Sequence, residues 1–146
     1  WCCDIRILGE GSVFGQPEVF LGIIPGGGAT QRLTGLVGRA TAKRLIWGGA
    51  QIAAAEALRL GLADEVVPDD ELLHRALALG AEYAEGPRLA IRAAKRAIDE
   101  GVDLPWPTGI DLELDLFLEV FETEDAHRGV ESFFEYGPGK ATFEGR

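Results

Sequence analysis

The sequence predicts an α/β fold in two parts, with strands and helices mixed over residues 1–67 and helices alone over residues 68–146. Residues 2–8 alternate in polarity as a half-buried strand does, and residues 63–67 form a second strand-like run. After Pro68 the apolar residues recur at helical spacing instead. With 146 residues, 47% of them hydrophobic, the chain is long enough to bury a core.

The first part is predicted to alternate short strands with helices. In the first strand, Cys3, Ile5 and Ile7 share one face. Pro17 favours a turn, because proline biases the residue before it away from helix. Glycines mark the ends of most elements. In order, we expect strands over residues 2–8 and 12–14, a helix that begins near Ala29, helices over residues 40–47 and 53–60, and a strand over residues 63–67.

The second part is predicted to hold four helices that expose large apolar side chains. Capping and proline signals place these helices over residues 69–85, 87–100, 108–122 and 125–136. Four helices this rich in large apolar residues cannot bury all of their apolar surface against one another. We therefore expect this part to bury surface against other subunits.

The charge of the chain argues against nucleic acid as a partner. Its 24 acidic and 14 basic residues give a net charge of -10, which repels a phosphate backbone. An anionic ligand could bind only at a local basic patch whose attraction exceeds the repulsion from the net negative charge of the chain. The one candidate patch consists of Arg88, Arg92, Lys95 and Arg96.

The two cysteines, Cys2 and Cys3, are adjacent, so no ordinary disulfide joins them. We expect them to be small core residues in a reducing, cytoplasmic protein. Neither a metal site nor a membrane segment is expected, because the cysteines and two histidines lack zinc-ligand spacing and no apolar run reaches about 18 residues. The chain contains no methionine and begins at Trp1 within a predicted buried strand, so we expect it to be a piece of a longer protein.

Three consecutive glycines, Gly26–Gly28, stand before the helix predicted from Ala29. No lysine follows them, as a phosphate loop requires, and Gln31 stands where a dinucleotide fingerprint needs glycine. Free backbone N–H groups at such a helix start can hold a water, a carboxylate or an oxyanion. A tight turn would use the same glycines, and the sequence leaves both interpretations open.

Glu18 is the acidic residue with the most unusual neighbours. It stands between Pro17 and the apolar run Val19–Leu21, so its carboxyl group is expected to be partly desolvated beside the glycine loop. Partial desolvation favours the protonated form of a carboxyl group and suits a proton donor. A lone glutamate is more often a solvated surface residue, and that alternative stays open.

Two stretches of sequence carry a specific pattern, Phe14-Gly15-Gln16-Pro17-Glu18-Val19 and Leu21-Gly22-Ile23-Ile24-Pro25-Gly26-Gly27-Gly28-Ala29-Thr30-Gln31-Arg32-Leu33. Together they resemble the enoyl-CoA hydratases of the crotonase superfamily. Similarity continues at residues 48–49, 53–57, 61–68, 121–125 and 129–130, so the resemblance covers essentially the whole chain. It implies a spiral core of repeated β-β-α turns, of which residues 1–67 are the C-terminal part. Residues 68–146 would be a helical region that makes trimers, often paired into hexamers.

The resemblance also implies an enzyme of fatty acid metabolism, a lyase that adds water across the 2,3 double bond of a 2-enoyl-CoA. Coenzyme A is part of the substrate, and no separate cofactor is expected. Glu18 matches the glutamate that donates a proton to the α-carbon, and Gly26 matches the glycine whose N–H helps to hold the catalytic water. The resemblance assigns substrate contacts to Leu21, Ile24 and Pro25 and coenzyme contacts to Phe117 and Lys140.

The chain departs from the family pattern in two places. The family's first catalytic glutamate and both oxyanion-hole residues would precede Trp1, and Tyr136-Gly137 stand where a basic pair is common. Two alternatives therefore remain. The protein could be another acyl-CoA enzyme of the superfamily, namely an isomerase, decarboxylase or thioester hydrolase, or the chain could be an inactive fragment that only oligomerises.

Overall fold

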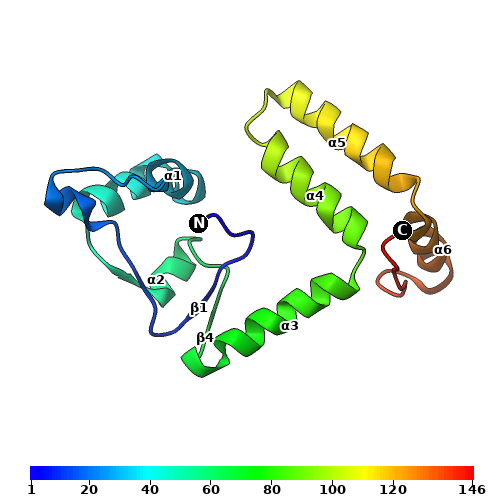
Figure 1. Cartoon of the computed structure of the whole chain (residues 1–146), viewed down its shortest axis with the longest axis horizontal. Helices are drawn as coiled ribbons and strands as arrows, with labels where there is room; N and C mark the ends of the chain where they lie inside the picture. The colour runs from blue at the N-terminus through cyan, green and yellow to red at the C-terminus, as the bar shows by residue number, and fades with distance from the viewer. The chain divides into compact units, whose positions relative to one another are not determined.

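The computed structural model describes all residues from Trp1 to Arg146. Contacts within the chain divide it into two compact units, Trp1–Leu77 and Ala78–Arg146, and helix α3 (Leu72–Glu85) runs through the division. Figure 1 labels the principal helices and two of the strands. The division predicted between residues 67 and 68 from the family pattern stays a prediction.

The first unit combines two small sheets with helices. Strand β1 (Ile7–Gly9) pairs in parallel with β4 (Glu65–Val67), and β2 (Val13–Phe14) pairs antiparallel with β3 (Ile52–Ala53). A 3-10 helix, η1 (Pro17–Leu21), precedes α1 (Ala29–Gly48), and α2 (Ala54–Arg59) follows β3. A further 3-10 turn, η2 (Asp69–Glu71), leads into α3.

Helix α1 is bounded by glycines and interrupted by one. Gly28 precedes it at φ 90°, and Gly49 ends it at φ 58° with its N–H donating to the carbonyl oxygen of Leu45. Gly38, at φ 74° and ψ 163°, breaks the helical conformation in the middle. Such positive φ angles are readily adopted only by glycine. The structure therefore confirms the predicted start at Ala29 and joins the two expected helices at a kink.

The core of the first unit is small and rich in alanine. Its buried members are Leu33, Ala42, Ile46, Ala57, Leu62 and Ala63. Two of these come from the second half of α1 and one from the first half, so both segments of the kinked helix pack on the same core. The core fixes the direction of α1 and with it the position of the glycine loop.

The N-terminal residues differ from the expectation. Only Ile7–Gly9 form a strand, and Cys2 and Cys3 are free and exposed, so the predicted strand over residues 2–8 and the predicted core cysteines are wrong. Strand β4 has three residues, Glu65–Val67, and its hydrogen bonds with the N-terminal residues extend back only to Arg6, whose carbonyl oxygen accepts from the N–H of Glu65 at 3.3 Å.

The second unit consists of helices. After the end of α3, helix α4 (Arg88–Gly101) and helix α5 (Trp106–Phe121) form a hairpin, and α6 (Glu124–Tyr136) follows (Figure 1). Thr123 caps α6, where its Oγ1 accepts a hydrogen bond from the N–H of Ala126 at 3.2 Å. The residues after Lys140, which we call the C-terminal segment (Ala141–Arg146), have no regular secondary structure.

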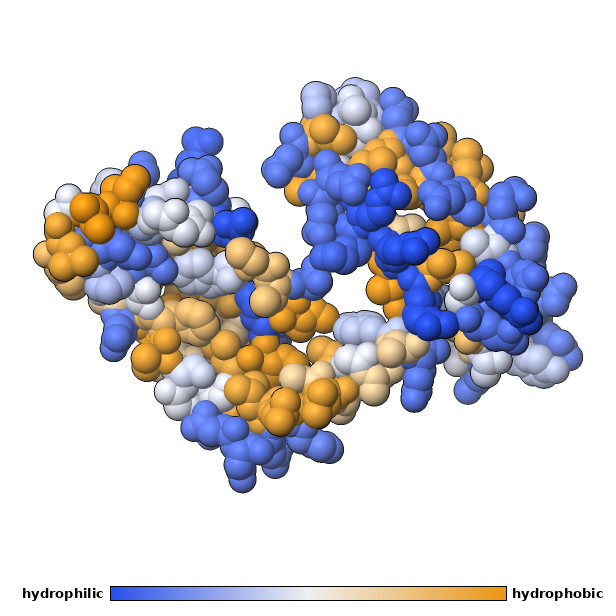
Figure 2. Space-filling model, in the orientation of Figure 1, coloured by the Kyte–Doolittle hydropathy of each residue, from blue (hydrophilic) through white to orange (hydrophobic).

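Large apolar side chains are exposed on both units, and Figure 2 shows hydrophobic patches on the visible face. In the second unit they include Trp106, Leu114, Phe117, Leu118, Phe133 and Phe134. Leu116 is the only fully buried apolar residue after Val67. The expectation that these helices bury surface against other subunits remains a prediction.

Candidate active site

Glu18 lies in the 3-10 helix η1, which Pro17 begins. Two backbone hydrogen bonds close this turn, from the N–H of Gly22 to the carbonyl oxygen of Val19 (3.1 Å) and from the N–H of Ile23 to that of Glu18 (3.3 Å). The Glu18 side chain is half-buried, and its Oε2 atom is buried without any hydrogen-bond partner. Because buried polar atoms are nearly always paired, an open carboxyl oxygen here is available to a ligand.

An exposed apolar loop follows Glu18. Leu21 and Ile24 are 76% and 72% exposed, and Ile23 is exposed between them, whereas Pro25 is buried. Figure 2 shows hydrophobic residues gathered over η1 and the loop after it. An uncovered apolar surface next to an unpaired carboxyl oxygen suits a substrate that combines an apolar chain with a reacting polar group.

The glycine loop leads from this apolar loop into α1. Nothing lies within 4 Å of the position that a methyl group would take on Gly26 or Gly27. The N–H groups of Gly26, Gly27 and Gly28 make no hydrogen bond within the chain. The loop thus presents several free N–H donors at the start of a long helix, where the helix dipole favours a partial negative charge.

Arg32, in the first turns of α1, folds back onto this loop. Its Nη1 atom donates to the carbonyl oxygen of Gly27 at 3.3 Å, and its backbone N–H donates to the carbonyl oxygen of Gly28 at 3.0 Å. Sequence reasoning singled out Gly26 and Glu18 but missed Arg32, because a side chain that folds back over five residues leaves no pattern in the sequence.

Five of the seven predicted site residues are near neighbours in the sequence. Glu18, Leu21, Ile24, Pro25 and Gly26 all lie on the one segment between the start of η1 and the start of α1. Phe117 and Lys140 belong to the second unit.

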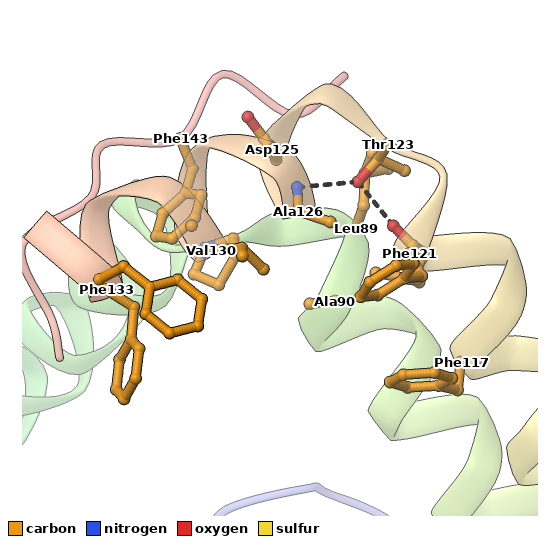
Figure 3. A pocket seen from close by; sticks show the side chains of 14 residues that line it. Leu89, Ala90, Phe117, Phe121, Thr123, Asp125, Ala126, Val130, Phe133 and Phe143 are labelled. Atoms are coloured by element: carbon orange, nitrogen blue, oxygen red, sulfur yellow. Dashed lines mark hydrogen bonds between the residues drawn. The ribbon is translucent and has the colours of Figure 1, made fainter.

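Phe117 lines an apolar cavity of about 620 Å³ in the second unit. It is 58% exposed and stacks on Phe121 with their ring centroids 5.5 Å apart. Figure 3 shows the walls of the cavity, with Ala90 of α4 facing these rings and Phe133 and Phe143 further along. Lys140 is exposed and does not line the cavity.

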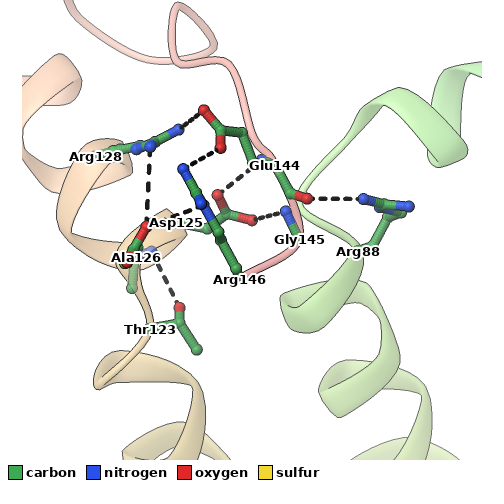
Figure 4. A network of polar contacts seen from close by, with 9 residues as sticks. Arg88, Thr123, Asp125, Ala126, Arg128, Glu144, Gly145 and Arg146 are labelled. Atoms are coloured by element: carbon green, nitrogen blue, oxygen red, sulfur yellow. Dashed lines mark hydrogen bonds and ion pairs between the residues drawn. The ribbon is translucent and has the colours of Figure 1, made fainter.

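The C-terminal segment is anchored beside this cavity by Asp125, which is only 3% exposed (Figure 4). The Asp125 carboxylate accepts hydrogen bonds from the N–H of Glu144 (2.8 Å) and of Gly145 (2.6 Å). These bonds lower the pKa of Asp125, the Glu144 bond most of all, and Arg128 lowers the pKa of Glu144 by a side-chain hydrogen bond. We call this arrangement the Asp125 clasp. No sequence pattern predicts it, because the partners lie 19 and 20 residues away in irregular chain.

The basic residues proposed for an anionic ligand have partners within the chain. Lys95 pairs with Asp99 at 2.8 Å and Arg96 pairs with Glu100 at 3.2 Å, both between successive turns of α4. Arg88 donates to the carbonyl oxygen of Glu144 at 2.8 Å. These contacts use most of the basic groups of α4 to organise its own unit.

The described side chains contain no cluster of three or more histidine, cysteine or acidic groups that could hold a metal ion. None of the helices is both long and apolar enough to cross a membrane.

The whole chain, residues 1–146, matches the protein family described as Enoyl-CoA hydratase/isomerase. It is 48% identical over 131 residues to a short-chain-enoyl-CoA hydratase of Clostridioides difficile, a match that covers 90% of this chain and 84% of that relative. A short-chain-enoyl-CoA hydratase of Clostridium acetobutylicum is 42% identical over 133 residues, which are 91% of this chain and 51% of that protein.

A solved structure shows the same likeness. The crystal structure of an enoyl-CoA hydratase from Bacillus anthracis matches 99% of this chain with a TM-score of 0.90 and 37% sequence identity. The match covers 55% of that structure's chain. Apart from the Clostridioides difficile protein, the chain thus spans about half the length of these relatives, and the likeness confirms the fold class predicted from the sequence.

Proposed function

The chain belongs to the enoyl-CoA hydratase/isomerase family, and we propose that the protein that contains it adds water across the 2,3 double bond of a 2-enoyl-CoA thioester. The observation that carries this proposal is the buried, unpaired Oε2 atom of Glu18. It lies in the segment that also holds the exposed apolar loop and the free N–H groups of the glycine loop.

In this reaction the oxygen of water adds to the β-carbon of the substrate and a proton adds to the α-carbon. Glu18 supplies the proton at the α-carbon, and the N–H of Gly26 helps to hold the water. Leu21, Ile24 and Pro25 contact the acyl part of the substrate. The oxyanion hole and the second carboxyl group come from chain outside the described residues, as the resemblance implies.

We further propose a short acyl chain for the substrate, because the relatives from Clostridioides difficile and Clostridium acetobutylicum are both named as short-chain-enoyl-CoA hydratases. Phe117 and Lys140 are proposed to contact the coenzyme part of the thioester, without any separate cofactor. The exposed apolar faces of the second unit support assembly into trimers or hexamers. We also propose that the protein is cytoplasmic and that it acts in fatty acid metabolism.

Hydration of crotonyl-CoA, followed by the loss of absorbance of its conjugated double bond, tests the proposal. The assay uses two proteins. One is the 146-residue chain alone, and the other, the joined protein, is this chain fused to the part of the Clostridium acetobutylicum relative that the chain does not match. We expect the joined protein to be active. The Glu18→Gln variant should lower its kcat by about 100-fold or more, since general acid catalysis contributes 10²–10⁴-fold.

Glu10→Gln is the matched control, because Glu10 is an exposed carboxylate of the same unit outside the site. It should leave kcat unchanged. Unchanged turnover in Glu18→Gln would contradict the role of Glu18. Double-bond isomerisation of a 3-enoyl-CoA without hydration would instead favour the isomerase alternative that the family description includes.

A further inference from the structure

The position of Arg32 is unfavourable for the helix that carries it. It is the fourth residue of α1, and the first turn of α1 contains no acidic residue that would neutralise it. The N-terminus of a helix carries a partial positive charge, so a cation there is repelled. Stabilisation of the helix therefore does not account for an arginine at this position.

The side chain of Arg32 occupies the space that a side chain on Gly28 would need. A methyl group placed on Gly28 would collide with Arg32 Nη1. From there Nη1 reaches the carbonyl oxygen of Gly27 at 3.3 Å. This oxygen lies outside the hydrogen-bond ladder of α1, because the first helical bonds, from Gln31 and Arg32, go to the carbonyl oxygen of Gly28.

This contact fixes the orientation of one peptide group. The Gly27–Gly28 peptide is trans, so its carbonyl oxygen and its N–H point to opposite edges of the same plane. When Arg32 binds the carbonyl oxygen, the N–H of Gly28 is turned to the side away from the guanidinium group. Three consecutive glycines have no side chains that would otherwise restrict this rotation.

We propose that Arg32 is a positioning residue for the hydration reaction, which holds the free N–H of Gly28 in the orientation in which it helps to bind the catalytic water. The inference rests on the proposed function. Arg32 acts through the backbone and touches neither water nor substrate. Because the Arg32 side chain is exposed and water competes for the carbonyl oxygen, the effect is moderate and falls on kcat.

The test compares Arg32→Ala, Arg32→Lys and the control Arg39→Ala in the joined protein. Arg39 is an exposed arginine of the same helix without an ion pair, so Arg39→Ala removes the same positive charge from the helix as Arg32→Ala does. Arg32→Ala should lower kcat by about 10-fold with KM within about 2-fold, and Arg32→Lys should restore part of the loss. Arg39→Ala should change neither constant.

Stability separates a positioning role from a structural one. Because Arg32 opposes the helix dipole, Arg32→Ala should leave the urea unfolding midpoint unchanged or raise it while kcat falls. A parallel loss of kcat and stability, an unchanged kcat, or an equal loss in Arg39→Ala would each overturn the inference.

An amide measurement keeps the inference independent of the proposed function. The NMR order parameter of the Gly28 N–H should be lower in Arg32→Ala than in the wild-type chain, because the peptide group is then free to rotate, and it should be unchanged in Arg39→Ala. An unaltered order parameter overturns the inference even in an active enzyme. A wild-type protein without hydration activity refutes the proposed function instead, while a lowered order parameter would still support the orienting contact.

Discussion

Two glycines, Gly101 of α4 and Gly109 of α5, lie against each other, and substitution of each by alanine is expected to change stability in the opposite direction. A methyl group on Gly109 would lie 3.0 Å from the carbonyl oxygen of Gly101, closer than van der Waals contact. On Gly101 the nearest atoms would be 3.9 Å away, an ordinary contact. Alanine is better than glycine in a helix by about 0.5–1 kcal/mol, and overpacking costs about 1–3 kcal/mol.

Gly101→Ala should therefore raise the free energy of unfolding by up to about 1 kcal/mol, while Gly109→Ala should lower it by about 1–2 kcal/mol. Urea unfolding followed by far-ultraviolet circular dichroism measures both. Both helices also line the apolar cavity, α4 through Ala90 and α5 through Phe117 (Figure 3). Equal stabilisation by both substitutions would show that the helices can separate freely and would refute the packing argument.

The remaining predictions concern the Asp125 clasp, the glycine loop and the core. Hydrogen bonds from the C-terminal segment hold the pKa of Asp125 below its ordinary value of 3.8, so the stabilisation is complete above about pH 4 and is lost as the pH falls through the lower, folded value. The hydrogen-exchange protection factors of the C-terminal segment, each referred to the intrinsic exchange rate at the same pH, should fall over that window, and the Asp125→Asn variant should lack the transition. Gly28→Ala should lower the urea midpoint, because φ is 90° there, whereas Gly26→Ala, with open space around it, should not. Leu33→Ala should cost about 2–5 kcal/mol in the same assay, because Leu33 is only 1% exposed, and a loss below 1 kcal/mol would contradict its place in the core.

The helices of this fold were predictable because glycine and proline mark their ends. The start of α1 at Ala29, the start of α4 just after Pro87 and the end of α6 at Tyr136 agree with the sequence patterns. These signals are local, since they depend on the φ angles that single residues adopt. Tertiary structure therefore had little opportunity to override them.

The strands were predicted less well because their extent depends on distant partners. Strand β3, Ile52–Ala53, has two residues and is too short to show an alternating pattern. Strand β1 extends only as far as its partner β4, which left Cys2 and Cys3 exposed. The sequence of residues 2–8 cannot predict the length of β4, because β4 lies nearly 60 residues further along the chain.

The candidate site divides in the same way. Glu18 and Gly26 could be identified from the sequence because they belong to a contiguous, family-like stretch. The reach of Arg32 to Gly27 and the hydrogen bonds of Asp125 to Glu144 depend on side-chain conformations and on chain returning from a distance. Sequence spacing carries no information about either.

The Asp125 clasp has a practical consequence for anyone who expresses this chain. The carbonyl oxygen of Arg146 accepts a hydrogen bond from the N–H of Asp125 at 3.0 Å, and its guanidinium group pairs with Glu124 and Glu144. An affinity tag joined directly to Arg146 would thus begin within an ordered network of hydrogen bonds and ion pairs. A flexible Gly/Ser spacer between Arg146 and the tag would prevent the tag from disturbing these contacts.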